Sequence, residues 1–192
     1  MCNAVDAGAE RKRLNFSHLA LQRFAFMADH GYRVAGTELT IVRFQKDDLV
    51  AAVYHGRSSY EVGFEIGRGD EQFSLSGLIR AVDADAAARY RNPVATTPSA
   101  LAEALELVAE LVERYGQQAL AGDAGFFQEL RHKRRTWTEE YALDVLADQV
   151  RPRAEAAFRE GRYREAAELY ERMSARLTPA EQKKLSAARK RS

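Results

Sequence analysis

Three short β-prone runs, separated by two turn signals, constrain the fold of this chain more than any other feature of its sequence. The runs span residues 39–44, 49–54 and 60–66. They are rich in β-branched and aromatic residues, whereas the segments between them carry the Asp, Gly and Ser residues typical of tight turns. Because such short connections join antiparallel neighbours, the pattern predicts an antiparallel meander.

The last of these runs alternates strictly between apolar and polar positions. It divides into one apolar and one polar face: Tyr60, Val62, Phe64 and Ile66 against Glu61, Gly63 and Glu65. Successive side chains of a strand point to opposite faces of a sheet. We therefore expect one face of the sheet to be buried and the other to be polar.

Helices before and after these runs complete the predicted fold. Asn15 or Ser17 can cap a helix that ends before Gly31, and its apolar residues fall mostly on one side. Residues 32–34 can add a short further strand. The sequence predicts an α+β fold, in which an N-terminal helix packs on a three- to four-stranded antiparallel meander, followed by a helical C-terminal region.

Two prolines indicate where the α+β part ends. Pro93 and Pro98 disfavour helix at the residue before each of them, which makes their surroundings the best linker candidate. We expect a flexible leader at 1–14, an α+β domain at 15–82, a linker at 83–99, and a helical region at 100–192 with a helical hairpin at 152–176 and a basic tail.

Charge and cysteine content argue against several classes of function. With 29 Lys and Arg against 28 Asp and Glu, the net charge of +1 creates no global attraction to nucleic acid or to a membrane. Cys2 is the only cysteine, so the chain has no internal disulfide. No signal-peptide core and no run of about 20 apolar residues is found. We expect a cytoplasmic protein without a membrane partner.

The sequence contains no motif for a cofactor or a metal. Gly67 and Gly69 form a G-x-G without the third glycine of a dinucleotide-binding loop. The four histidines lack ligand spacing with one another or with cysteine, which a structural zinc site would need. We expect neither a cofactor nor a metal.

The polar side of the meander is the main candidate contact surface. It comprises Arg43, His55, Arg57, Glu61 and Glu65. The first helix of the helical region adds a glutamate stripe opposite its apolar stripe: Glu103, Glu106, Glu110 and Glu113. We interpret both as surfaces that bind a protein partner, without a catalytic residue.

Two alternatives remain open at this point. An enzyme could use His55 with Glu61 and Glu65, the one place where a histidine and carboxylates could converge for general acid–base chemistry. A nucleic-acid-binding accessory protein could use two basic clusters. The first cluster contains Arg131, Lys133, Arg134 and Arg135 beside Trp137, and the second spans 183–191 with Lys183, Lys184, Arg189, Lys190 and Arg191. The near-neutral total charge weighs against nucleic acid.

Residues 158–170 resemble the second half of a tetratricopeptide repeat. Gly161, Tyr163, Ala166 and Tyr170 match the glycine, aromatic, alanine and aromatic positions of that family. The glycine permits a sharp turn, and the alanine lets two helices approach closely. Because only about one repeat is covered, the resemblance implies a single helical hairpin that serves for packing or for a homodimer interface.

A second resemblance covers residues 50–78. There, a strand that ends at Tyr54 and a turn at 56–58 precede a second strand at 60–62 and the tripeptide 73–75. This pattern is similar to small bacterial proteins of unknown function, some of them immunity proteins of toxin systems. It implies a non-catalytic interaction protein that neutralises a co-encoded toxin by direct binding.

Overall fold

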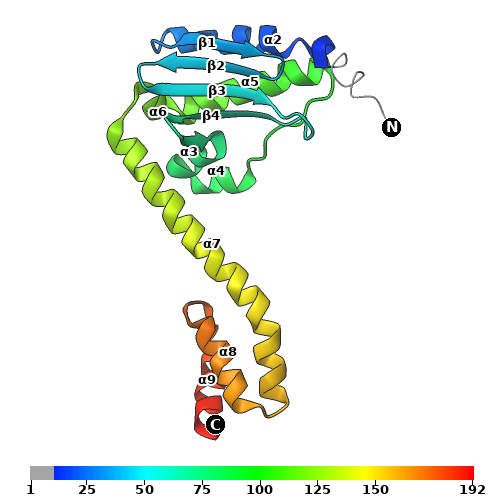
Figure 1. Cartoon of the computed structure of the whole chain (residues 1–192), viewed down its shortest axis with the longest axis vertical. Coiled ribbons are helices and arrows are strands. Elements are labelled where there is room, and N and C mark those ends of the chain that lie inside the picture. The colour runs from blue at the N-terminus through cyan, green and yellow to red at the C-terminus, as the bar shows by residue number, and fades with distance from the viewer. Residues whose placement is uncertain (1–10) are drawn as a thin grey trace. The chain divides into compact units, whose positions relative to one another are not determined.

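Five antiparallel strands, neighbours in space as in sequence, form the sheet of this protein (Figure 1). The strands are β1 (Arg33–Glu38), β2 (Ile41–Lys46), β3 (Leu49–His55), β4 (Val62–Arg68) and β5 (Glu71–Ser74). The α+β class and the antiparallel meander are as the sequence predicts, but the strands number five rather than three or four. The additional strand β5 has only four residues, too few to show a clear alternation in the sequence.

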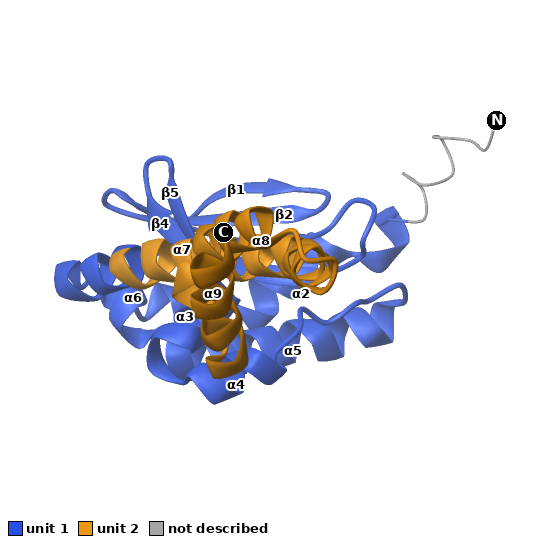
Figure 2. Cartoon of the chain, turned by 90° about the horizontal axis from the view of Figure 1, so that it is seen from below, with its two compact units in different colours: residues 1–131 blue, residues 132–192 orange. Residues whose placement is uncertain are grey.

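The computed structural model describes residues 11–192, and the chain divides into two units between Arg131 and His132 (Figure 2). The first unit holds the sheet with α2 (Phe16–Arg23), the 3-10 helix η1 (Ala25–Ala28), α3 (Leu75–Val82), α4 (Ala84–Arg89), α5 (Pro98–Tyr115) and α6 (Gln117–Ala121). The second holds α8 (Tyr163–Arg172), the 3-10 helix η2 (Ser174–Arg176) and α9 (Pro179–Arg191). Helix α7 (Ala124–Arg159) contributes residues to both units.

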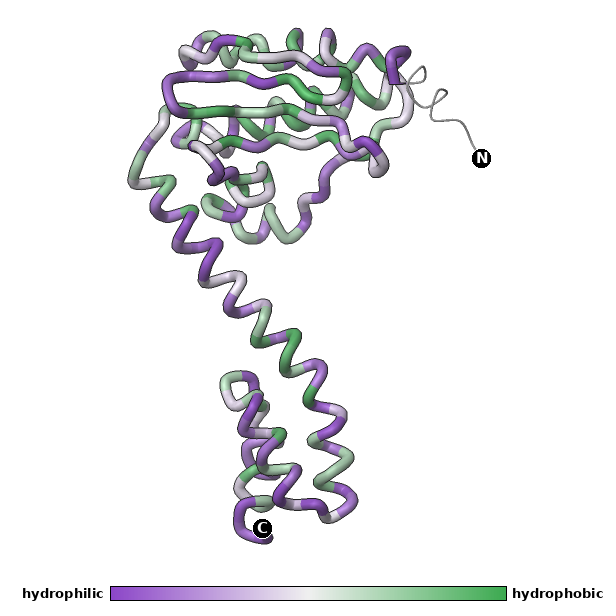
Figure 3. The backbone as a smooth tube through the Cα atoms, viewed as in Figure 1, coloured by the Kyte–Doolittle hydropathy of each residue, from purple (hydrophilic) through white to green (hydrophobic). Residues whose placement is uncertain are grey.

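One face of the sheet forms the core of the first unit. Its buried side chains are Val42, Phe44, Ala51, Val53, Val62, Phe64, Ile66 and Phe73. Helix α5 contacts β4 and supplies the opposing side of this core through Leu101, Leu105, Val108 and Val112. Figure 3 shows the corresponding hydrophobic stretches along the strands. The apolar stripe of α5 therefore belongs to the sheet domain and not to a separate helical domain.

The N-terminal helix is shorter than predicted. Helix α2 ends at Arg23, where Phe24 leaves the helical conformation, and η1 follows. The Phe24 ring stacks on Phe64, with 6.0 Å between centroids and 9° between ring planes. Phe24 follows the helix directly and continues the side that Phe16 and Ala20 bury, so it extends the contact of α2 with the core.

Residues 11–14 belong to the folded unit rather than to a flexible leader. They are helical, and Arg11 and Leu14 are 7% and 3% exposed. The rest of the predicted leader, with Cys2, lies outside the described residues.

The predicted linker at 83–99 is also part of the first unit. It contains α4, and its Val94 pairs with Glu61 in an antiparallel bridge. The backbone N–H of Val62 donates to the Pro93 carbonyl oxygen at 2.8 Å. Helix α4 ends at Arg89 and α5 begins at Pro98, and the backbone between them, at Pro93 and Val94, pairs with the start of β4. The boundary between the units falls instead within α7.

Small side chains dominate the core of the second unit. Its buried residues are Ala147, Val150, Ala154, Ala157, Ala166, Ala167, Leu169, Tyr170, Met173, Leu185 and Ala188. The hairpin predicted at 152–176 corresponds to the end of α7, a turn at Gly161, and α8. Gly161 has a φ of +75°, a conformation that costs glycine little. In the part of the chain from 11 to 192, none of the helices has the length and apolarity of a membrane span.

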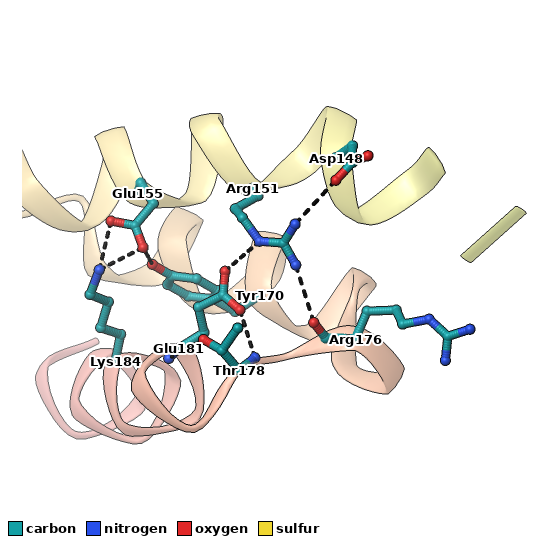
Figure 4. Close-up of polar contacts among 8 residues, drawn as sticks. All are labelled: Asp148, Arg151, Glu155, Tyr170, Arg176, Thr178, Glu181 and Lys184. Atoms are coloured by element: carbon teal, nitrogen blue, oxygen red, sulfur yellow. Dashed lines mark hydrogen bonds and ion pairs between the residues drawn. The ribbon is translucent and has the colours of Figure 1, made fainter. Parts of the chain in front are cut away.

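Two glutamates tie α9 to α7 in this unit (Figure 4). Glu181, which is 4% exposed, accepts hydrogen bonds from Arg151 Nε and from the Thr178 backbone N–H, both at 2.7 Å. Glu155 accepts from Lys184 Nζ at 2.5 Å. Burial alone would raise the pKa of the Glu181 carboxyl, but the hydrogen bonds from Thr178 and Arg151 outweigh burial and hold that pKa below its ordinary value.

Replacing Glu181 with glutamine should destabilise the second unit at pH 7 by about 1–3 kcal/mol, because Arg151 loses its charged partner. The pKa of Glu181 is lower in the folded than in the unfolded chain. The Glu181 carboxylate therefore contributes fully to the free energy of unfolding above the unfolded pKa of about 4.3. This contribution is lost as the pH falls through the folded pKa. Amide hydrogen exchange of α8 and α9 at pH 7 checks the loss, and urea unfolding at successively lower pH checks its acid dependence.

The matched control for this variant is Glu168→Gln, which removes an exposed carboxylate from α8. It should cost less than about 0.5 kcal/mol, since its ion pair with Arg164 is exposed and spans 3.8 Å. Equal losses in the two variants would contradict the role assigned to Glu181.

Candidate functional site

The second face of the sheet is not covered by a helix of residues 11–192. Helices α2, α3, α5 and α6 contact the strands, and their buried side chains join the core beneath the first face. Figure 1 shows the strands in front of α5. Arg43, Ala52 and Glu65 lie in register across β2, β3 and β4 on the uncovered side. We name this surface, formed by Ile41, Arg43, Ala52, Tyr54 and Glu65, the open face.

A shallow cavity of about 290 Å³ lies on the open face. It is lined by Thr40, Ile41, Arg43, Ala52, Tyr54, His55, Gly56, Arg57 and Glu65. Arg43 and Arg57 bring positive charge to this lining, and Glu65 brings negative charge. Arg43 also pairs with Glu38 of β1 at 2.5 Å. The cavity therefore offers both signs of charge within a partly buried surface.

Tyr54 belongs to β3 and reaches over β4 on the open face. Its ring lies over Gly63, where a Cβ atom would meet the ring carbon Cζ at 2.3 Å. The Tyr90 hydroxyl donates to Asn92 Oδ1 at 3.0 Å. Burial is the main cause that raises the pKa of Tyr54, and the Glu65 carboxylate adds to it. Burial likewise raises the pKa of Tyr90 to about 12. Both hydroxyls are therefore protonated at neutral pH and able to donate.

His55 is buried, in contrast to its predicted place on the polar face. It is 2% exposed, and its Nε2 lies 2.8 Å from the Ala95 carbonyl oxygen. Its ring stacks on Phe16 at 5.9 Å and meets the edge of Tyr60 at 5.6 Å. Desolvation is the main cause that lowers the pKa of His55, and the charge of Arg11 lowers it further. His55 is thus a neutral residue of the core at pH 7.

The burial of His55 separates it from the carboxylates of the enzymatic alternative. Glu65 lies on the open face, whereas His55 points to the core side of the same sheet. The alternation of β3 carries a signal for this placement, because His55 shares strand parity with the buried Ala51 and Val53. The turn residues that follow His55 favour the opposite interpretation, in which the histidine lies at an exposed end of the strand.

Arg11 holds the turn between β3 and β4, beside the cavity. Its guanidinium donates to the carbonyl oxygen of Gly56 at 3.0 Å and to that of Arg57. It also lies 4.6 Å from the centre of the Tyr60 ring. Tyr60 has a φ of +56°, which non-glycine residues rarely adopt, so the turn depends on such contacts. The sequence gives no signal for this role, because a lone arginine in a polar run reads as exposed.

Glu61 lies beside the cavity and does not line it. It is half-buried, and its carbonyl oxygen accepts a hydrogen bond from the Gly56 backbone N–H at 2.7 Å. Arg57 is exposed in the same turn. The structure thus brings Arg43 and Glu65 of the open face and Arg57 of the adjoining turn together around the cavity, with Glu61 at its margin.

The glutamate stripe lies on the side of α5 that faces away from the core. Glu103, Glu110 and Glu113 are exposed, and Glu106 is half-buried and pairs with Arg23. Since α5 packs on the core side of the sheet, it separates the stripe from the open face. The two predicted contact surfaces are therefore on opposite sides of the first unit and cannot form one patch.

Several basic residues of the nucleic-acid alternative have acidic partners. Arg131 pairs with Glu71 at 3.0 Å, and Arg189 pairs with Glu171 at 2.9 Å. Lys184 binds Glu155, as described above. Exposed side chains of the two clusters are Lys133, Arg134, Arg135 and Trp137 on α7 and Lys183, Lys190 and Arg191 on α9, where Arg191 donates to the Tyr163 hydroxyl at 2.9 Å. Part of the basic charge predicted to bind nucleic acid therefore forms ion pairs within each unit.

The burial of His55 predicts a loss of stability in mild acid. Its pKa is lower in the folded than in the unfolded chain, so the unfolded chain takes up the proton first as the pH falls. Stability should therefore fall as the pH drops from about 6.5 through the folded pKa. His55→Gln should cost about 1–3 kcal/mol at pH 7 and remove this dependence. Urea unfolding between about pH 7 and pH 5 measures both effects.

The control for this variant is His132→Gln, which changes an exposed histidine of α7. In this variant, stability should fall with decreasing pH in mild acid as it does in the unmodified chain. If the dependence survives His55→Gln, or disappears with His132→Gln, another group causes it.

The residues brought together at the open face form a charged cavity that Tyr54 also lines. Among residues 11–192, no three His, Cys, Asp or Glu side chains converge as metal ligands. Comparison with protein-family models, with curated proteins and with solved structures finds no match to this chain.

Proposed function

We propose that this chain is a non-catalytic protein-interaction protein that binds a partner protein through the open face of its sheet. The observation that carries the proposal is the uncovered sheet face with its cavity of about 290 Å³. Strands paired on both sides and a buried core beneath them give this surface a rigid support. A rigid surface binds with a lower cost in conformational entropy than a flexible one.

The chemistry of the open face suits an interface with another protein. Arginine and tyrosine are enriched at the centres of such interfaces, and Arg43, Arg57 and Tyr54 supply them here. Glu65 adds an acceptor beside these donors. We expect the partner to insert a side chain into the cavity and to present an acidic group towards the arginines.

The more specific form of the proposal is an immunity-type protein that neutralises a co-encoded toxin by direct binding. It is supported by the pattern of residues 50–78, which resembles such proteins and includes β3 and β4 beside the cavity. Binding of this kind needs complementary shape and charge but no catalytic group.

The test is complex formation with the product of the neighbouring gene. The two proteins should form a 1:1 complex, and the double substitution Arg57→Glu/Glu65→Arg should weaken it at least about tenfold, because charges at the cavity are reversed. Isothermal titration calorimetry measures the affinity. The matched control is Asp85→Arg/Arg89→Glu, which exchanges two exposed charges on α4 and should leave the affinity unchanged.

Two results would contradict parts of this proposal. Binding that survives the cavity variant but is lost with Glu110→Lys/Glu113→Lys would place the interface on α5 and not on the open face. The absence of any complex with the neighbouring gene product would remove the immunity-type form.

A further inference from the structure

Residues 131–142 of α7 are exposed around the helix, apart from the half-buried Thr136. This stretch carries Trp137 and Tyr141, whose exposed fractions are 48% and 59%. Their rings stack, with 5.9 Å between centroids and 25° between planes. Exposed apolar groups that lie side by side leave water together when a second surface covers them, which favours association. We name Trp137 and Tyr141 the aromatic pair.

The aromatic pair lies away from the core of the second unit. Helix α7 contributes Ala147, Val150 and Ala154 to that core. At 3.6 residues per turn, these residues lie on average about 130° around the helix axis from the aromatic pair. A second molecule can therefore contact the aromatic pair without displacing α8 or α9.

One charge of each sign flanks the aromatic pair on the same side of α7. Arg134 precedes Trp137 by one turn, and Asp144 follows Tyr141 by one turn. Along the helix the order is positive, aromatic, aromatic, negative. Two such helices in parallel would place like charges together, whereas two antiparallel helices place opposite charges together.

We propose that this side of α7 binds the same side of α7 in a second copy of the chain, antiparallel, to form a homodimer. A two-fold axis beside position 139 places Trp137 of each copy against Tyr141 of the other. The same register places Arg134 of each copy opposite Asp144 of the other. Each contact is made twice, as in any isologous interface. This inference does not depend on the proposed function of the open face.

The size of the contact predicts a weak dimer. Four aromatic rings, each about half exposed, bury on the order of 400 Å², whereas specific interfaces bury at least roughly 1,200 Å². Asp144 also keeps its ion pair with Arg176, at 2.6 Å. We expect a dissociation constant in the micromolar range or weaker, and one that rises with salt because exposed charge pairs are screened.

The acidic residues of this stretch favour a second copy over nucleic acid. Glu139, Glu140 and Asp144 lie within two turns of Trp137. They would repel a phosphate backbone that approached the aromatic rings. In the antiparallel dimer, the charge of Asp144 instead contributes to binding.

Sedimentation velocity of the full chain at increasing concentration tests the dimer. The mass should double, and because Trp137 is the only tryptophan, its fluorescence should shift to the blue over the same concentrations. Arg134→Glu and Asp144→Arg should each weaken the dimer about tenfold. An equimolar mixture of the two variants should restore it, because the mixed dimer has opposite charges at both contact points.

The matched control is Arg135→Glu, which makes the same charge change on the adjacent residue. Arg135 is exposed but lies about 140° around the helix from the aromatic pair, so dimerisation should change less than about threefold. Circular dichroism verifies that each variant keeps its helices.

Three results would overturn the proposal. The first is a chain that stays monomeric up to about 1 mM. The second is an equal loss of dimer affinity with Arg134→Glu and with Arg135→Glu. The third is a mixture of Arg134→Glu and Asp144→Arg in which dimerisation does not recover. Quenching of Trp137 by a single-stranded oligonucleotide at low salt, with the chain monomeric, would overturn it in favour of nucleic acid.

Discussion

The packing of α5 against one face of the five-stranded sheet is the contact on which the rest of the first unit depends. Burial of side chains such as Phe44, Phe64 and Leu105 contributes about 1.5–3 kcal/mol each. An exposed ion pair such as Arg43 with Glu38 contributes less than about 1 kcal/mol. The buried face therefore fixes the fold, and the charges of the open face are available for binding at little cost to stability.

The strict alternation of the strands connects this core to the candidate site. Each buried residue of β2, β3 and β4 fixes its neighbours in sequence on the opposite face, so Val42 and Phe44 direct Arg43 outwards. The same rule directs His55 inwards. The turn that follows His55 borders the cavity, and the buried Arg11 holds its backbone. The geometry of the cavity thus depends on residues that no partner would contact.

The parts of the structure that the sequence predicts are those with a repeating period. The alternation at 60–66 and the apolar stripe of α5 identify the meander and a long helix. The extent of the sheet domain was not predictable in this way, because Pro93 marks the end of a helix but gives no signal of the backbone pairing beside it. Likewise, the pattern of apolar residues at 19–27 gives no sign that α2 ends at Arg23 and that a 3-10 helix follows.

Amide chemical-shift mapping of the full chain, titrated with the protein that it binds, tests most directly whether the open face binds a partner, as we propose. The largest changes should lie at residues 40–43, 52–57 and 65, with the glutamate stripe of α5 unaffected. Changes concentrated on α5, with residues 52–57 unchanged, would contradict this proposal.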